Sequence, residues 1–261
     1  MAKIHKLANR TKERQVFLEM VRAEHDCRIL LIEGESGMGK STLLTSFRQE
    51  CQKFDSVSDV TFDCKGLVSL AAFLYQFLED LGKGSFPRFT KQVNKMSGGG
   101  IEFADNEISG QNQISIALNP GVDARAQEFR QEQLLEAFVE DLLAMPQRIV
   151  IILDTFQEAN ETLQHWISGR WLRTVSRKLT NVVMVVAGHH VPDHNNSVWG
   201  DNCEHFPLKG IEDPKEWCNY ARSIGFETLP EDAIKCLALH CDGIPESVIK
   251  ALNTINAKWT A

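Results

Sequence analysis

One eight-residue segment, Gly34–Ser41, constrains the fold of this chain more than any other. It reads Gly-Glu-Ser-Gly-Met-Gly-Lys-Ser and matches the pattern G-x-x-x-x-G-K-[ST] at every fixed position. Glycines allow the backbone to curve closely around a phosphate group, and the N–H groups at the start of the next helix point at it. An apolar run, Cys27–Ile32, precedes the segment, and a helix is predicted from Lys40 to about Lys53. This strand–loop–helix setting predicts a phosphate-binding loop, here called the P-loop.

The P-loop chemistry assigns a first set of site residues. We expect Lys40 to reach the β- and γ-phosphates of a nucleoside triphosphate, and the Ser41 hydroxyl to bind Mg²⁺. The predicted ligand is therefore ATP or ADP with Mg²⁺. The predicted nucleotide-binding residues of this segment are Gly34, Glu35, Ser36, Gly37, Met38, Gly39, Lys40, Ser41 and Thr42.

A second buried strand supplies an acid. The apolar run Ile149–Leu153 ends at Asp154, which is predicted to hold the magnesium shell. Glu158 follows four residues later and has two interpretations. It either polarises the attacking water, or it is a first-turn helix residue stabilised by the helix dipole. The predicted catalytic set is Lys40, Asp154 and Glu158.

Strand-like and helix-like segments alternate along the chain, which predicts an α/β fold with a parallel sheet between two helical layers. Further strands are expected at Val57–Asp63, Val182–Ala187 and His205–Leu208. The expected helices before position 210 are Thr11–Glu24, Leu67–Leu81, Arg125–Met145 and Leu163–Leu179.

Two domains are predicted. Residues 1–210 form the nucleotide-binding domain, and 211–261 form a helical subdomain with helices at Pro214–Ile224, Pro230–His240 and Pro245–Ala257. Within the first domain, residues 83–124 are rich in Gly, Ser, Asn and Gln, which predicts a flexible insertion.

Composition bears on location and partners. The net charge of −7 argues against nucleic acid as a partner, because binding to a phosphate backbone needs a basic surface. The apolar runs are far shorter than the ~20 residues that cross a bilayer, and the first residues lack a signal-peptide pattern. The seven cysteines are scattered and form no C-x-x-C pair, which fits a reducing compartment. We therefore expect a cytoplasmic protein without a membrane partner.

Several short motifs together resemble the STAND class of ATPases, which are relatives of the AAA+ proteins and include NACHT and NB-ARC modules. Asn9-Arg10-Thr-Lys-Glu13 resembles the entry helix of that class, and Asp154-Thr-Phe-Gln-Glu158 resembles the end of its acidic strand. The run Val182–Ala187 with Gly188-His189 resembles its sensor-1 strand. Gly243-Ile244-Pro245 resembles the G-x-P motif of its helical subdomain.

This resemblance implies a molecular switch that exchanges ADP for ATP, hydrolyses slowly and acts on protein partners in signalling or defence. Arg10 and His189 would then lie near the nucleotide, and Pro245 near its base. Such proteins often carry an acid where this chain has Gln157, whose amide is not a general base. The chain ends at Ala261, so we expect partners or sequences outside this chain to supply the sensor and effector functions. Homo-oligomers are also expected. Two alternatives stay open: a nucleotide-binding scaffold without hydrolysis, and a DNA-handling AAA+ ATPase.

Three further features have ordinary and functional interpretations. Arg170, Arg173 and Arg177 fall on one helical face, as a solvated stripe or as an arginine finger toward a neighbouring subunit. The segment Gly84–Lys95 is interpreted as a disordered tether or as a contact for single-stranded nucleic acid. A set of zinc-ligand types is interpreted as ordinary loop residues rather than a metal site. That set is His189, His190, Asp193, His194, Cys203 and His205.

Overall fold

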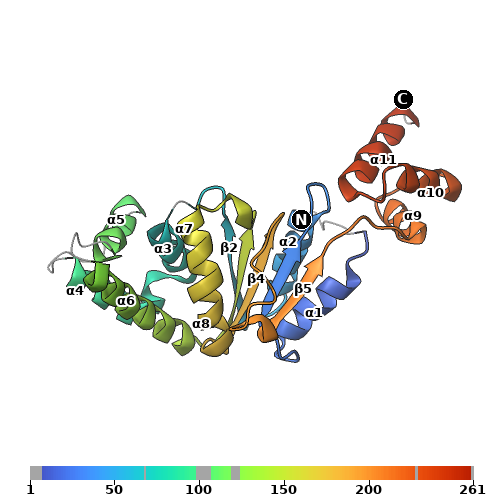
Figure 1. Cartoon of the computed structure of the whole chain (residues 1–261). Coiled ribbons are helices and arrows are strands. Elements are labelled where there is room, and N and C mark those ends of the chain that lie inside the picture. Colours follow the sequence, from blue (N-terminus) through green and yellow to red (C-terminus); the bar gives the residue numbers. More distant parts are fainter. Residues whose placement is uncertain (1–7, 68, 98–106, 119–123, 227–228, 260–261) are drawn as a thin grey trace.

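The computed structural model describes residues 8–67, 69–97, 107–118, 124–226 and 229–259. Its centre is one sheet of five parallel strands in the order β2-β3-β4-β1-β5 (Figure 1). The strands are β1 Ile29–Glu33, β2 Val57–Asp63, β3 Arg148–Asp154, β4 Val182–Gly188 and β5 Cys203–Pro207. The sequence prediction of a parallel α/β sheet is therefore confirmed.

Helices cover both faces of the sheet. The main ones before position 210 are α1 Thr11–Val21, α2 Lys40–Cys51, α3 Leu70–Leu81, α4 Pro87–Met96, α5 Glu107–Leu118, α6 Ala124–Ala144, α7 Glu161–Trp166 and α8 Leu172–Arg177. Alternate residues of β1 face opposite layers. Ile29 and Leu31 join a core with α3, α6 and α8, whereas Leu30 and Ile32 join a core with α1 and α2. The fold thus has the three layers expected from the sequence.

The segment 83–124 is largely helical where the structure describes it, so the prediction of a flexible insertion is wrong there. It contains a short 3₁₀ turn, Lys83–Ser85, followed by α4 and α5. Phe86, Phe89 and Val93 recur at three- and four-residue spacing, and none of the three exposes any surface. These side chains pack in the same core as α3 and α6. Burial of apolar surface, which favours order, outweighs the polar composition of the segment.

The predicted helix Leu163–Leu179 is divided into three parts. A π-helical turn, Ile167–Trp171, separates α7 from α8. Trp171 is fully buried, and its ring stacks on that of Trp166 with 5.7 Å between centroids. Trp171 is therefore a core residue, and Trp166 is partly buried against the same core.

Three helices follow the last strand: α9 Pro214–Ser223, α10 Glu231–His240 and α11 Pro245–Trp259. They share a small core of their own around Trp217 and Leu252, and Figure 1 shows them beyond the edge of the sheet. The boundary at 210 stays a prediction. None of the described helices is both long and apolar enough to cross a membrane.

Candidate nucleotide-binding site

The P-loop connects β1 to α2 at the carboxyl edge of the sheet. The Gly34 N–H donates to the carbonyl of Gly188 at the end of β4, at 3.1 Å. Gly37 and Gly39 have φ angles of +81° and +84°, in the left-handed region that side chains disfavour. Glycine at these two positions allows the loop to turn back on itself just before α2 begins at Lys40.

Lys40 lies against the inside of the P-loop. Its Nζ donates to the carbonyl of Gly34 at 2.6 Å and to that of Glu35 at 2.9 Å. Burial lowers the pKa of the Lys40 amine below its ordinary value, and the charges of Asp154 and Glu35 partly offset this. The residue is only 9% exposed, so the amine is held over the loop where a phosphate would bind.

Ser41 and Asp154 meet across the gap between α2 and β3. The Ser41 hydroxyl donates to Oδ2 of Asp154 at 3.0 Å, and Oδ1 of Asp154 accepts the N–H of Thr155 at 2.8 Å. A hydroxyl and a carboxylate are the oxygen ligands that suit Mg²⁺. The pair therefore fits a magnesium ion, which would supply positive charge next to bound phosphates.

A cavity of about 1120 Å³ opens over the P-loop, large enough for a nucleotide. Its other wall is α11. The predicted site residues that line it are Ser36, Gly37, Gly39, Lys40, Ser41, Thr42, Asp154, Glu158, His189 and Pro245. Those that do not line it are Arg10, Gly34, Glu35 and Met38. Most of the site residues predicted from the sequence therefore line one cavity.

Comparison with known protein families identifies the family to which most of the chain belongs. Residues 22–192 match the family model described as an AAA domain. The chain belongs to the AAA domain family. The matched region includes the P-loop, Asp154 and His189, whereas Arg10 and Pro245 lie outside it. Among curated proteins, none matches the sequence.

Solved structures share the fold of this AAA protein. Cdc6p from Pyrobaculum aerophilum has 11% sequence identity and a TM-score of 0.53, with 91% of this chain and 58% of that chain covered. The ORC2 protein of Aeropyrum pernix, in ADPNP-ADP complexes, has 13% identity and a TM-score of 0.52, with 96% and 64% covered. The ORC1 protein of Aeropyrum pernix, in complex with DNA, has 12% identity and a TM-score of 0.46, with 91% and 55% covered.

The matches to Cdc6p and ORC2, whose TM-scores exceed 0.5, show the fold and leave finer predictions open. This AAA chain spans less than two thirds of the length of each of the three proteins. The matches do not establish the STAND class in particular. They also give no support to the expectation that nucleic acid is an unlikely partner.

Arg10 contacts the P-loop of the AAA protein outside the cavity. It has a left-handed φ of +70°, and its Nη2 donates to the carbonyls of Met38 at 3.2 Å and Lys209 at 2.7 Å. Glu13 lies 3.5 Å from its other nitrogen, Nη1. Burial lowers the pKa of the Arg10 guanidinium, and Glu13 opposes that effect. The geometry thus gives Arg10 a contact to the loop rather than to the cavity.

Gln157 links the end of β3 to the end of β4. Its Oε1 accepts the N–H of His189 at 2.9 Å, and a Cβ at Gly188 would lie only 2.6 Å from the same oxygen. The His189 Nδ1 lies 3.5 Å from Oε2 of Glu35 in the P-loop. Gln157 therefore positions His189, a role that the sequence reasoning missed because nothing in the local pattern marks it.

The cavity also has a wall of α11 residues that the sequence reasoning missed. The Glu246 N–H donates to the carbonyl of Gly37 at 3.1 Å, which joins α11 to the P-loop. The lining residues of this wall, with Lys65 from the loop after β2, are Lys65, Glu246, Ile249, Lys250, Asn253 and Thr254. Positions 246, 249, 250, 253 and 254 recur at helical spacing after the Gly-Ile-Pro motif, and that signal was available.

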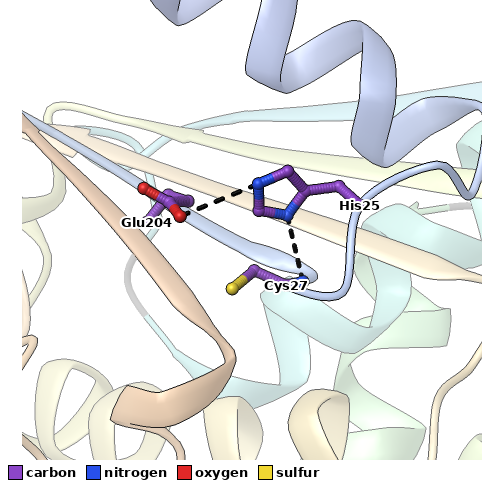
Figure 2. A group of neighbouring side chains, drawn as sticks. All are labelled: His25, Cys27 and Glu204. Carbon is purple, nitrogen blue, oxygen red and sulfur yellow. Dashed lines mark hydrogen bonds and ion pairs between the residues drawn. The ribbon is translucent and has the colours of Figure 1, made fainter.

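The six zinc-ligand types named in the sequence do not form a group of three or more around one point in the described residues, although the rings of His194 and His205 stack with 4.3 Å between centroids. The group that does gather in this way is His25, Cys27 and Glu204, whose ligand atoms lie within 4.8 Å of one another. It lies near the start of β1, and Figure 2 shows a dashed line from the histidine ring to each of the other two residues. The Nδ1 atom of His25 accepts the Cys27 N–H at 3.1 Å, and Nε2 lies 3.7 Å from Oε1 of Glu204. A neutral ring then carries its proton on Nε2, where a metal would need a lone pair. One backbone hydrogen bond and one side-chain contact of 3.7 Å therefore hold the group together.

The arginine stripe lies in a groove between α6 and α8. Arg170 contacts Glu132 of α6 at 3.5 Å, and Arg173 and Arg177 line the same groove. Lys178 extends the row of cations, while Glu132 and Glu136 counter part of its charge. The two interpretations of the stripe both remain predictions.

The segment Gly84–Lys95 is ordered in the AAA protein. It covers the end of the 3₁₀ turn and α4 as far as Lys95, and the Phe89 N–H donates to the buried carboxylate of Asp141 in α6 at 2.8 Å. Arg88 also contacts Asp141, at 3.2 Å. The interpretation as a disordered tether is therefore wrong, because its aromatic residues lie in the core rather than in solvent.

Proposed function

We propose that this chain binds ATP with Mg²⁺ in the cavity over the P-loop and hydrolyses it slowly. The observation that carries the proposal is the contact of Ser41 with Asp154 beside Lys40. Lys40 would leave the carbonyls of the loop and bind the β- and γ-phosphates, while the loop N–H groups hold them. The ion would supply charge neutralisation on the phosphates.

We propose further that the nucleotide acts as a switch of the STAND type. The support is the hydrogen bond between Glu246 in α11 and Gly37 in the P-loop, because it connects the helical segment to the loop that contacts phosphate. A bound triphosphate would change the position of the loop and so bias the contact with α11. Protein partners would bind the two arrangements of α11 with different affinities.

The experiment measures nucleotide content and turnover of the purified chain. Bound nucleotide is released by denaturation and identified by chromatography, and phosphate release is followed with Mg²⁺-ATP. We expect co-purified ADP and slow turnover that Lys40→Ala abolishes. Retained ATP without turnover would instead indicate a scaffold, and the absence of both bound nucleotide and ATP binding would contradict the proposal.

A DNA-handling AAA+ ATPase is the second candidate, and one observation favours it. Four cations, Arg170, Arg173, Arg177 and Lys178, line one groove of about 430 Å³. The chain also shares its fold with Cdc6p and an ORC protein. The acidic residues of the groove and the net charge of −7 weigh against it.

Fluorescence titration with short duplex and single-stranded DNA at low salt separates the two candidates. Binding that weakens steeply with salt and is lost in Arg173→Glu would support DNA handling. Equal binding by the wild type and Arg173→Glu would indicate that the groove is not the contact. We expect no binding by either protein.

A further inference from the structure

Two carboxylates lie side by side at the carboxyl edge of the sheet. β2 and β3 are parallel and in register, and their last aligned pair is Asp63 with Asp154. Asp154 is already engaged, since one of its oxygens accepts the Ser41 hydroxyl and the other accepts the Thr155 N–H. Asp63 is therefore a second acid next to the magnesium site, and none of the roles assigned above uses it.

Thr155 connects this second acid to the cavity. Its side chain lies on the cavity wall, and its Oγ1 is 2.8 Å from Oδ1 of Asp63. Oγ1 of Thr155 also lies 2.7 Å from the carbonyl oxygen of Asp154. A hydroxyl has one proton, and an ionised carboxylate is a stronger acceptor than a carbonyl. The proton of Thr155 therefore belongs on the side of Asp63, and a lone pair of Oγ1 is left for a donor in the cavity.

The backbone at this point is held in an unusual conformation. Thr155 has a φ of +54°, in the left-handed region, which is costly for a β-branched residue. The contact to Asp63 fixes the side chain in that conformation, and the Lys65 N–H donates to the same Oδ1 at 3.1 Å. Backbone strain of this kind persists only where the surrounding contacts hold the residue in its conformation, and it is common at functional sites.

Glu158, the acid that the sequence favoured, is less constrained. It is exposed and lies on a short 3₁₀ turn, Phe156–Glu158. Within the described residues, no hydrogen bond or ion pair holds its carboxylate. A group that takes a proton in the transition state has to be positioned within hydrogen-bond reach. Hydrogen bonds hold Thr155 and Asp63 in place at the edge of the cavity, whereas none among the described residues holds the Glu158 carboxylate.

We propose that Thr155 and Asp63 form the proton path for ATP hydrolysis, an inference that rests on the proposed function. The oxygen of a water bonds to the γ-phosphorus as the bond from phosphorus to the β-phosphate oxygen breaks and ADP leaves. One proton of that water passes to Oγ1 of Thr155, and the hydroxyl proton of Thr155 passes to Oδ1 of Asp63. Asp63 is exposed, so it then returns the proton to solvent.

Matched substitutions at Asp63 and Thr155 test the path. Asp63→Asn keeps an oxygen that accepts the Thr155 and Lys65 hydrogen bonds but cannot take the proton. Thr155→Val keeps the branched shape without the hydroxyl, and Thr155→Ser keeps the hydroxyl. We expect Asp63→Asn and Thr155→Val to lower kcat about 100-fold while KM changes by less than about threefold. Thr155→Ser should retain more of the wild-type kcat than Thr155→Val does. Thr45→Val, whose hydroxyl faces the Ser41 carbonyl within α2, is the control and should stay within about threefold of the wild-type kcat.

The readouts are phosphate release and binding of a fluorescent ATP analogue, with thermal unfolding as the check on folding. Wild-type kcat in Asp63→Asn would overturn the path, and so would a large loss in Glu158→Gln alone. If the chain binds Mg²⁺-ATP in a Lys40-dependent way but does not hydrolyse it, the proton path is overturned and the proposed ATP binding is retained. If no ATP binds, the proposed function itself fails.

Discussion

The hydroxyl of Ser41 and the carboxylate of Asp154 are 3.0 Å apart and join the first turn of α2 to the end of β3. Within the described chain, neither side chain makes another side-chain hydrogen bond across this gap, so the pair is arranged around one small space at the P-loop end of the cavity. Oxygen ligands on two different elements allow an ion to hold those elements together.

Ser41→Ala and Asp154→Asn should each remove the Mg²⁺-dependent part of ATP affinity. We expect ATP to bind the wild type at least about tenfold more tightly with Mg²⁺ than with EDTA, and both variants equally in the two conditions. Isothermal titration calorimetry measures the difference. Thr45→Val is the control, because its hydroxyl faces the Ser41 carbonyl in the same helix. A variant that retains the full Mg²⁺ effect would contradict the assignment.

Arg10→Ala should destabilise the chain and weaken nucleotide binding together. The variant leaves the carbonyls of Met38 and Lys209 without their charged donor, which should lower the free energy of unfolding by about 2 kcal/mol. Urea denaturation measures the change. Lys91→Ala on α4 is exposed and should stay within about 0.5 kcal/mol of the wild type. Unchanged stability in Arg10→Ala would show that the contacts to the P-loop are not formed in solution.

Phe89→Ala tests whether the segment after α3 is part of the core. Phe89 is fully buried, so we expect a loss of about 3–5 kcal/mol in the free energy of unfolding. Phe129→Ala on α6 removes the same side chain at a position that is 61% exposed, and it should cost less than about 0.5 kcal/mol. Equal and small effects in both variants would mean that α4 is not docked.

The sequence could assign candidate residues of the P-loop because its parts are local. Gly37, Gly39, Lys40 and Ser41 act through backbone geometry and charge within a few residues, so a short pattern identifies them. Asp154 follows from the end of an apolar run. The strand order, by contrast, brings Asp63 next to Asp154 across more than ninety residues, and no spacing in the sequence predicts that register.

The errors have a common physical cause. Composition dominated the interpretation of residues 83–124, although Phe86, Phe89 and Val93 carry a helical spacing there. Gln157 was considered as a missing acid, whereas its amide has a positive role because one oxygen accepts the His189 N–H. The packing of residues 83–124 and the role of Gln157 both depend on partners from other elements, which propensity and spacing do not describe.

Glu50 gives a prediction about pH. It is 9% exposed and accepts hydrogen bonds from Lys53 at 2.7 Å and Arg14 at 2.9 Å. Burial alone raises the pKa of the Glu50 carboxyl, but the two cations outweigh it and the pKa lies below its ordinary value of 4.5. A lowered acid pKa stabilises the fold above the unfolded value, and that stabilisation is lost as pH falls through the folded value.

Glu50→Gln should therefore lower the free energy of unfolding by about 1 kcal/mol at pH 7, because the amide keeps the shape without the charge. The difference from the wild type should shrink once the pH falls below about 4.5, as the wild-type carboxyl takes up its proton. Urea denaturation at pH 7 and at pH 3.5 measures both values. Glu24→Gln, whose side chain is 59% exposed, is the control and should show little change at either pH. A difference that stays constant between the two pH values would mean that the ion pairs of Glu50 contribute nothing to stability.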